Sequence, residues 1–552
     1  MSCLMASAGV DSRFRISVSV CAREPVGIEW HEEGATVSFT DSNLPIVVIE
    51  TNGKRIRNST RTVVDMGIID NGTGKRNRIT DPFNDYEGKI NIEIRGSSGQ
   101  WQNWPKIQYA FETQDSLGNN RNTSLVGLPS ENDWILHPPY SDKSLIRNAL
   151  VYKLTNDIGH YASRTVFCEL VLDGDYRGVY LVMEKIKRDK NRVDISRLDP
   201  EDVSGDRLTG GYIIKIDREA GEENDGWDSE FTQSTRRVRY LYHYPKPFDI
   251  VEEQKAYIRN FVHKFELLMN GADWKSSYLE YFNLEEFIDY WIINELTRNV
   301  DAYSLSTFLH KDRDSMGGKL VFGPVWDYNL GFGNVNYYTG EETAGLMLER
   351  KVALSDKIPF WLANFSKDEE IKRRFADRWF VLRRDVLSLE RIYSIIDEWV
   401  VQLDEAQKRN FERWRILGQY VWPNNFVGDT YEEEIAYLKH WIRDRVTWLD
   451  GYLTTQIATI SSNEDRGFYL GQNYPNPFNG KTTIPFYLPT SGSVVIEFFD
   501  MLGRRLDVWS YGDSPAGSHR IVFDAGVFSS GQYFYRLRTD RETESKAMQV
   551  VK

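Results

Sequence analysis

Alternating hydrophobic and polar residues predict that the first half of the chain is rich in β-strands. Within residues 89–96, the isoleucines at 90, 92 and 94 alternate with polar side chains, which is the period of a half-buried strand. Residues 166–172 and 178–183 are apolar runs on either side of an Asp-Gly-Asp turn. This arrangement is typical of a β-hairpin. One helix is expected among these strands, from about Ser141 to Leu154, with Gly159 beyond its end.

From about residue 249 the hydrophobic period becomes helical. The clearest helix is expected over 283–299, where apolar residues recur at spacings of three and four behind the capping pair Asn283 and Glu286. Further helices are expected within 366–415 and 429–455. The pattern therefore predicts an α+β protein with a strand-rich lobe at 44–248 and a helix-rich lobe at 249–460.

The pattern changes again near the C-terminal end. Residues 461–466 form a polar linker, and after it short β runs separated by turn residues predict a small Ig-like β-sandwich over 467–552. At the other end, residues 13–20 alternate like the middle of a strand. We expect residues 1–43 to form an N-terminal strand segment, either by itself or as the end of a preceding domain.

Composition excludes several classes of protein. The chain has 552 residues, with 68 basic and 81 acidic side chains and a net charge of −13. No run approaches the roughly 18 apolar residues of a membrane-spanning helix, and the mean hydropathy is −0.50, so we expect no transmembrane segment. No block of five Lys or Arg residues occurs, which disfavours nucleic acid as a partner. Three cysteines without CxxC spacing support neither a disulfide framework nor a zinc site.

Two aspartates carry the most informative chemistry. Asp301 follows the predicted helix over 283–299, and Asp327 ends an apolar strand before a glycine-rich loop. A hairpin of about 26 residues would bring them together, as a phosphoryl-transfer site requires. One carboxylate would orient or deprotonate an acceptor hydroxyl and the other would hold Mg²⁺. Two solvent-exposed turn aspartates fit the same spacing.

Positive charges for phosphate groups are expected from the strand-rich lobe. The candidates are Arg95, Lys106, Arg147 and Lys215, of which the lysines lie in apolar strand context, where a charge needs a partner or a ligand. Glu184 could pair with one of these cations or form a surface ion pair with its neighbouring lysines. Neither GxGxxG nor the Walker motif occurs, so a nucleotide site here would be built differently.

A series of motifs resembles the spore-coat CotH kinase family, in unbroken order over about Leu44 to Leu453. The motifs are Arg95-Gly-Ser-Ser98, Pro105-Lys106, residues 124–134, 141–148, 178–185 and 210–215, and Pro324-Val-Trp-Asp327. The resemblance implies an atypical, two-lobed protein-kinase-like fold that binds ATP with Mg²⁺ and phosphorylates Ser or Thr of a protein substrate.

The resemblance also implies roles for individual residues. Asp301 would be the catalytic-loop aspartate, Asp327 the metal-holding aspartate and Lys106 the lysine that contacts phosphate. The cleft would include Arg95, Arg147, Glu184 and Lys215.

The sequence departs from the family pattern at positions near the expected metal site. Family members often carry an asparagine a few residues after the first aspartate, whereas this loop offers only Ser304, Ser306 and Thr307. Many also carry an aspartate where this chain has Asn329. An amide oxygen such as that of Asn329 still ligates Mg²⁺ but brings no charge. Two alternatives therefore stay open: a kinase-like surface module that binds without catalysis, and a metal-dependent hydrolase that uses the same carboxylates.

The last segment resembles the C-terminal sorting domain of type IX secretion cargo. The motifs that carry this resemblance are residues 470–478, 499–504, 516–519, 530–536 and 546–552. The resemblance implies handling by the type IX secretion machinery and a secreted or cell-surface, outer-membrane-associated location.

Overall fold

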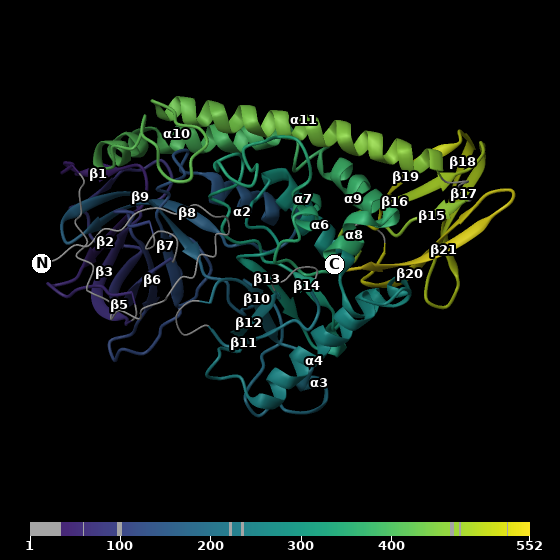
Figure 1. Ribbon diagram of the computed structural model, residues 1–552, viewed down its shortest axis with the longest axis horizontal. Helices are drawn as coiled ribbons and strands as arrows, with labels where there is room; N and C mark the ends of the chain where they lie inside the picture. The colour runs from purple at the N-terminus through teal and green to yellow at the C-terminus, as the bar shows by residue number, and fades with distance from the viewer. Residues whose placement is uncertain are drawn as a thin grey trace, which may run out of the picture. The chain divides into compact units, whose positions relative to one another are not determined.

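The protein forms two compact units, Met1–Asp450 and Gly451–Lys552 (Figure 1). The computed structural model describes residues 35–58, 60–96, 102–219, 224–232, 237–463, 468–473, 476–526 and 528–551. Most of the N-terminal strand segment expected over 1–43 lies outside these ranges. Helix α11 (Tyr431–Asn463) contains the boundary between the units, so the first three residues of the expected linker are helical. The mixture of helices and strands confirms the α+β class.

A closed β-barrel forms the beginning of the first unit. All its neighbouring strands are antiparallel except the pair β2 and β8. The isoleucines 90, 92 and 94 of β5 point into the barrel core, as their alternation predicts. In barrel order the strands are β2 (Ile46–Glu50), β3 (Thr62–Ile69), β5 (Tyr86–Arg95), β6 (Gln108–Thr113), β7 (Asp133–His137), β9 (Asp175–Glu184) and β8 (Thr165–Leu172). A separate short ladder joins β1 (Asp41–Ser42) to β4 (Asn77–Arg78).

The expected hairpin is confirmed as the pair β8 and β9. Its turn places Asp173 at φ 49° and Gly174 at φ 77°. Two consecutive left-handed residues match the right-handed twist of the strands, which explains the Asp-Gly sequence.

Helix α2 (Arg147–Ile158) begins later than the sequence indicates. The Asp142 carboxylate accepts hydrogen bonds from the backbone N–H of Ser144 (3.1 Å) and of Arg147 (2.8 Å). Residues 142–146 are therefore held in a turn, and the helix follows it. The helix ends as predicted at Gly159, which is left-handed at φ 111°.

A five-stranded antiparallel sheet follows the barrel. In sheet order its strands are β11 (Gly226–Asp228), β12 (Arg239–Tyr244), β10 (Tyr212–Ile216), β13 (Thr307–Lys311) and β14 (Leu320–Phe322). Helix α6 (Leu284–Thr297) leads into β13, and the predicted cap is confirmed because Asn283 accepts a hydrogen bond from the Glu286 N–H.

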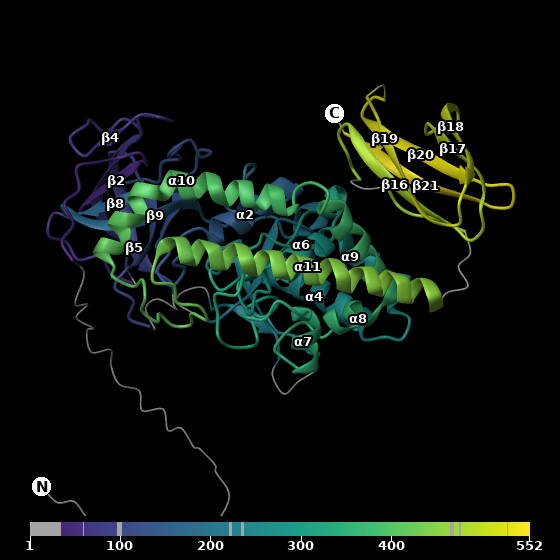
Figure 2. The same ribbon diagram turned by 90° about the horizontal axis from the view of Figure 1, so that it is seen from above.

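The remaining helices belong mostly to the second half of the first unit. Helices α10 (Leu389–Arg413) and α11 lie side by side (Figure 2), and the Tyr393 hydroxyl of α10 donates to the Lys439 carbonyl of α11 (2.6 Å). Arg409 of α10 pairs with Glu169 of the barrel (2.6 Å). The others are α3 (Gly205–Leu208), α4 (Glu252–Met269), α5 (Tyr278–Tyr281), α7 (Met347–Ala353), α8 (Leu362–Lys367) and α9 (Glu369–Leu382), with 3₁₀ turns at Trp274–Ser276 and Asp314–Met316.

The second unit contains two antiparallel sheets around one hydrophobic core. One sheet has the order β15 (Tyr469–Leu470), β16 (Lys481–Leu488) and β19 (Gly517–Asp524). The other has the order β18 (Arg505–Ser514), β17 (Gly492–Phe499), β20 (Gly531–Arg538) and β21 (Thr543–Val550). Ile484 and Phe486 of the first sheet and Ile496 and Phe498 of the second belong to this core.

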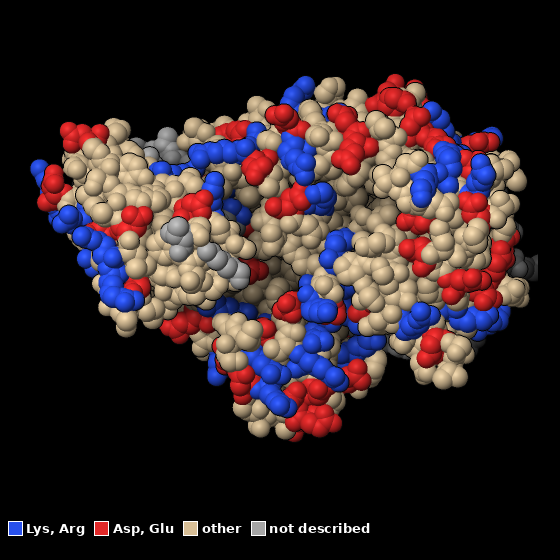
Figure 3. All heavy atoms as spheres, turned by 180° about the vertical axis from the view of Figure 1, so that it is seen from behind, with Lys and Arg blue, Asp and Glu red and all other residues tan. Residues whose placement is uncertain are grey.

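Two surface properties bear on function. Across the described residues, no helix has both the length and the apolar composition required to cross a membrane. On the face drawn in Figure 3, basic and acidic side chains are interspersed. The net charge of −13 is therefore not concentrated on this face as one acidic surface.

Candidate active site

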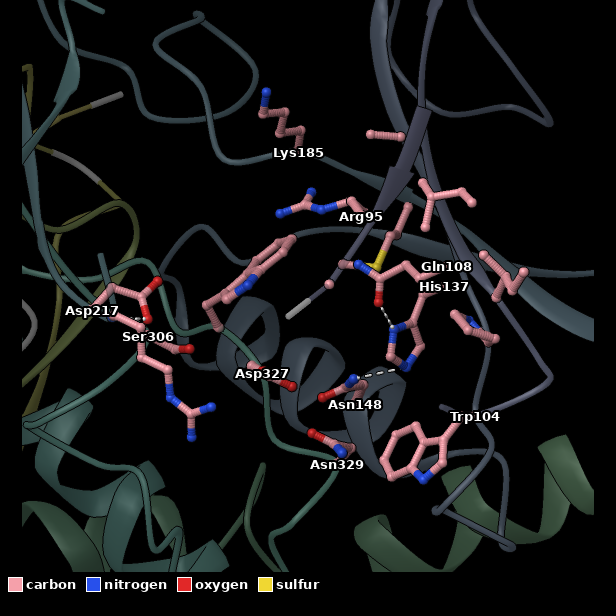
Figure 4. Close-up of a pocket in the computed structure, with 18 of the residues that line it drawn as sticks. Arg95, Trp104, Gln108, His137, Asn148, Lys185, Asp217, Ser306, Asp327 and Asn329 are labelled. Atoms are coloured by element: carbon pink, nitrogen blue, oxygen red, sulfur yellow. Dashed lines mark hydrogen bonds between the residues drawn. The ribbon is translucent and has the colours of Figure 1, made fainter. Parts of the chain in front are cut away.

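A cavity of about 1110 Å³ opens between the barrel and the five-stranded sheet of the first unit. Strands β5, β6 and β7 contribute Arg95, Gln108 and His137 to its wall (Figure 4). Asp301 lines it from the turn before β13, and Asp327 from the loop after β14. The two aspartates that the sequence pairs therefore line the same cavity.

Asp301 lies in the turn that follows α6. Its N–H donates to Asn299 Oδ1 (3.1 Å), and its carbonyl accepts from the Leu305 N–H (2.9 Å). Burial raises the pKa of the carboxyl, while the positive charges of Lys351 and Arg218 oppose the rise. The carboxylate accepts no hydrogen bond from any residue that the structure describes. Its oxygens are therefore available to an incoming hydroxyl group.

The buried side chain of Lys351 holds the turn that carries Asp301. The Lys351 ammonium donates to Ser304 Oγ (3.0 Å) and pairs with Asp356 (3.4 Å). Ser304 Oγ in turn donates to the Asp301 carbonyl (3.1 Å). Helix α7, which carries Lys351, thereby fixes the turn and places a positive charge behind Asp301.

Asp327 lies five residues beyond β14, whereas the sequence predicted that it ends that strand. Its backbone is left-handed at φ 64°, a conformation that is uncommon for residues other than glycine and that concentrates at functional sites. The Asp327 N–H donates to the Tyr152 hydroxyl (3.1 Å). Burial raises the pKa of the Asp327 carboxyl to about 7, the charges of Asp301 and Asp217 add to the rise, and Arg95 opposes it. The negative charge of Asp327 is therefore poorly compensated.

A hydrogen-bonded chain of side chains holds the loop at Asp327. Gln108 Oε1 lies 3.1 Å from His137 Nδ1, and His137 Nε2 lies 3.1 Å from Asn148 Nδ2 (Figure 4). Asn148 Oδ1 accepts from the Tyr328 N–H at 2.6 Å. Because the Asn148 oxygen faces Tyr328, its NH₂ group faces His137. Nε2 is therefore the acceptor and Nδ1 carries the proton. Burial lowers the pKa of His137 to about 4, so the ring is neutral.

Three of the predicted cations line the cavity. Arg95 lies with its guanidinium carbon 5.8 Å from the centre of the Trp326 ring, and Lys215 reaches the wall from β10. Lys106 also lines the cavity, but its ammonium donates to the Val179 carbonyl (2.6 Å) and to Asn410 Oδ1 (2.8 Å). Burial holds the pKa of Lys106 well below its usual range. In the structure, this ammonium joins the barrel to helix α10.

Two predicted cleft residues lie outside the lining and are bonded elsewhere. The Arg147 guanidinium is buried against the Asp142 carboxylate (2.6 Å). Glu184 is buried and binds the guanidinium of Arg164 (2.7 Å) rather than one of the predicted cations. Their direct contact with a nucleotide stays a prediction.

The structure adds charged residues to which the sequence interpretation gave no role, and two of them lie near Asp301. Asp217 and Arg218 follow β10 directly and line the cavity. Figure 4 shows Asp217 beside Ser306, which precedes β13. The available signal was their position two and three residues beyond Lys215, because the end of one strand of a sheet lies beside the start of its antiparallel neighbour.

The oxygen donors at this end of the cavity fit a magnesium ion that is shared with phosphate groups. No group of three or more His, Cys, Asp or Glu side chains in the described ranges is placed to hold a metal ion by itself. Mg²⁺ commonly uses one or two carboxylates together with phosphate oxygens and water. Asp327 supplies a poorly compensated carboxylate, and Asn329, which also lines the cavity, supplies an amide oxygen.

Comparison with known proteins gives two matches. A family model described as CotH kinase protein matches residues 92–449. A second, described as a secretion system C-terminal sorting domain, matches residues 472–551 and marks the chain for export to the cell surface or beyond it. None of the curated proteins compared with the chain matches it.

Proposed function

Because this chain belongs to the CotH kinase protein family, we propose that its first unit is a kinase-like phosphotransferase. It moves the γ-phosphate of Mg-ATP to a Ser or Thr hydroxyl of an extracellular or envelope protein. The predicted lobes of a kinase-like fold stay residues 44–248 and 249–460, although the five-stranded sheet takes β10, β11 and β12 from the first range and β13 and β14 from the second. The observation that carries it is the shared cavity of Asp301 and Asp327.

The proposed reaction assigns a distinct task to each aspartate. Asp301 accepts a hydrogen bond from the acceptor hydroxyl and takes its proton as the oxygen bonds to the γ-phosphorus. The bond from the γ-phosphorus to the oxygen that bridges to the β-phosphate breaks, and ADP leaves with that electron pair. The raised pKa of Asp301 suits a group that must accept a proton. Asp327 and Asn329 would hold Mg²⁺, which supplies positive charge to the phosphate oxygens when bound.

The cations proposed to contact phosphate differ in the surroundings of their side chains. Arg95 and Lys215 line the cavity, and the Arg95 guanidinium lies over the Trp326 ring. Lys106 must exchange its bond to the Val179 carbonyl for one to phosphate. We therefore propose Arg95 and Lys215 as cations that neutralise ATP, and Lys106 only if its ammonium leaves the Val179 carbonyl.

Single substitutions test these roles. Asp301→Ala and Asp327→Ala are expected to reduce Mg-ATP-dependent phosphate transfer by at least about 10²-fold. Asp385→Ala removes an exposed carboxylate outside the cavity and serves as the matched control. Undiminished transfer by folded Asp327→Ala protein would refute the assignment.

A second candidate function is a binding module without catalysis. Two observations favour it: the amide of Asn329 brings no charge to a metal, and the Lys106 ammonium is already bonded. Calorimetric titration with Mg-ATP separates the two functions. Heat of binding together with thermal stabilisation supports the kinase, and the absence of both supports a scaffold.

The partner for export follows from the second match. We propose that residues 467–552 are recognised by the type IX secretion machinery. A chain that lacks these residues is expected to stay inside the cell, and its appearance on the cell surface would contradict the proposal.

A further inference from the structure

Arg218 lies where two segments of the active site meet. Strand β10 ends at Ile216, which pairs with Thr307 at the start of β13. The chain beyond β10 therefore runs beside the turn that carries Asp301 and Ser306. Arg218 lines the cavity at this point.

The side chain of Arg218 has no hydrogen-bond or ion-pair partner among the residues that the structure describes. It is also exposed. Two other cations of the same cavity are engaged: Arg61 pairs with Glu112 (2.5 Å), and the Lys106 ammonium donates to Asn410 (2.8 Å). Arg218 thus places a positive charge beside the candidate catalytic aspartate.

The positive charge of Arg218 affects the pKa of both candidate aspartates. Its charge opposes the rise in pKa of Asp301, of Asp327 and of Tyr337, another cavity residue. The guanidinium therefore lies on the side of the cavity where the acceptor hydroxyl and the terminal phosphate would meet. Arginine suits this position because its planar fork of donors matches phosphate oxygens.

We propose that Arg218 is a further catalytic residue that binds the terminal phosphate of the nucleotide during transfer. This inference rests on the proposed kinase function. As the acceptor oxygen bonds to the γ-phosphorus, its proton passes to Asp301 and ADP leaves with the electrons of the broken bond. Arg218 stabilises the charge on the three phosphate oxygens that remain on the transferred phosphorus.

The test compares Arg218→Ala and Arg218→Lys with Arg207→Ala in the full chain. Arg207 is a suitable control because it is an exposed arginine of the same unit outside the cavity. Arg218→Ala is expected to lower phosphate transfer by about 10³-fold. Arg218→Lys is expected to fall between it and the wild type. A rate within about threefold of the control would overturn the inference.

Nucleotide binding provides a readout that does not depend on turnover. Calorimetry with Mg-ATP and Mg-ADP is expected to show that Arg218→Ala weakens Mg-ATP binding by about tenfold or more. Mg-ADP binding should change little, because ADP lacks the terminal phosphate. Equal losses for both nucleotides, or none, would overturn the role of Arg218. A wild-type protein that binds neither nucleotide would instead refute the proposed function, and this inference with it.

Discussion

Asn148 provides the sharpest test of how the active-site loop is held. Its side chain joins the Tyr328 N–H (2.6 Å) to His137 Nε2 (3.1 Å) and is buried. Replacing Asn148 with Ala removes both bonds and leaves the buried Tyr328 N–H without its partner. An unsatisfied buried polar group costs about 1–3 kcal/mol. With two groups affected, we expect the first unit to lose about 2–4 kcal/mol of stability.

This loss of stability can be measured by urea unfolding, with tryptophan fluorescence as the signal. Lys153→Ala on the same helix removes only a partly exposed ion pair with Asp157 and should cost less than about 1 kcal/mol. Mg-ATP binding should also weaken in Asn148→Ala, because the loop that carries Asp327 and Asn329 loses its anchor. A stability change no larger than that of the control would refute the reasoning.

An Asn148→Asp variant tests the protonation of the chain. One carboxylate oxygen keeps the bond to the Tyr328 N–H, while the other faces His137 Nε2, which is also an acceptor. A proton on Nε2 resolves this conflict, so we expect the pKa of His137 to rise from about 4 in the wild type. In the wild type the unfolded chain binds the His137 proton first, so stability falls as pH drops below the usual pKa of histidine, and a higher pKa in the variant lessens this fall. The loss of unfolding free energy in Asn148→Asp, relative to the wild type, should therefore be smaller at pH 5 than at pH 8. The opposite order would contradict the assigned tautomer.

Three further substitutions test other parts of the account. Burial raises the pKa of Glu266 to about 7, so between its usual value and pH 7 the unfolded chain ionises first and stability falls as pH rises. The free energy of unfolding of the wild type should therefore fall by about 3 kcal/mol between pH 5 and pH 8, and Glu266→Gln should remove this fall. Identical pH profiles of the wild type and the variant would contradict the prediction. Lys106→Met should destabilise the first unit by about 1–3 kcal/mol in urea unfolding, because the Val179 carbonyl and Asn410 lose their donor. Calorimetry on Lys106→Met then tests the proposed phosphate contact: unchanged Mg-ATP affinity would exclude it. Glu184→Gln should lower thermal stability, because it weakens a buried pair with Arg164, and leave Mg-ATP affinity unchanged; the reverse would place Glu184 in the nucleotide site.

Local patterns predicted the elements that depend on neighbours in sequence. The isoleucines of β5 and the Asn283 cap of α6 follow from short-range periodicity and capping chemistry, and both are confirmed. The β13–β14 hairpin explains why Asp301 and Asp327 line one cavity. These features need no knowledge of distant residues.

The bonding partners of the buried charges could not be predicted in this way. The Lys106 ammonium is bonded to Asn410 in α10, 304 residues further along the chain. Glu184 is bonded to Arg164 across the β8–β9 hairpin, whereas Arg147 is bonded to a carboxylate only five residues before it. Burial decides these pairings, because an unpaired charge is too costly in the interior, and burial depends on the packed fold.

The central claim is that the first unit transfers phosphate from ATP. Its most direct test is a mass-spectrometric search for added phosphate on the protein itself and on co-secreted proteins after incubation with Mg-ATP, with Asp301→Ala as the comparison. The account predicts phosphoserine or phosphothreonine with the wild-type protein and its loss in Asp301→Ala. Equal phosphate incorporation by the two proteins, or none by the wild type on any of these proteins, would contradict it.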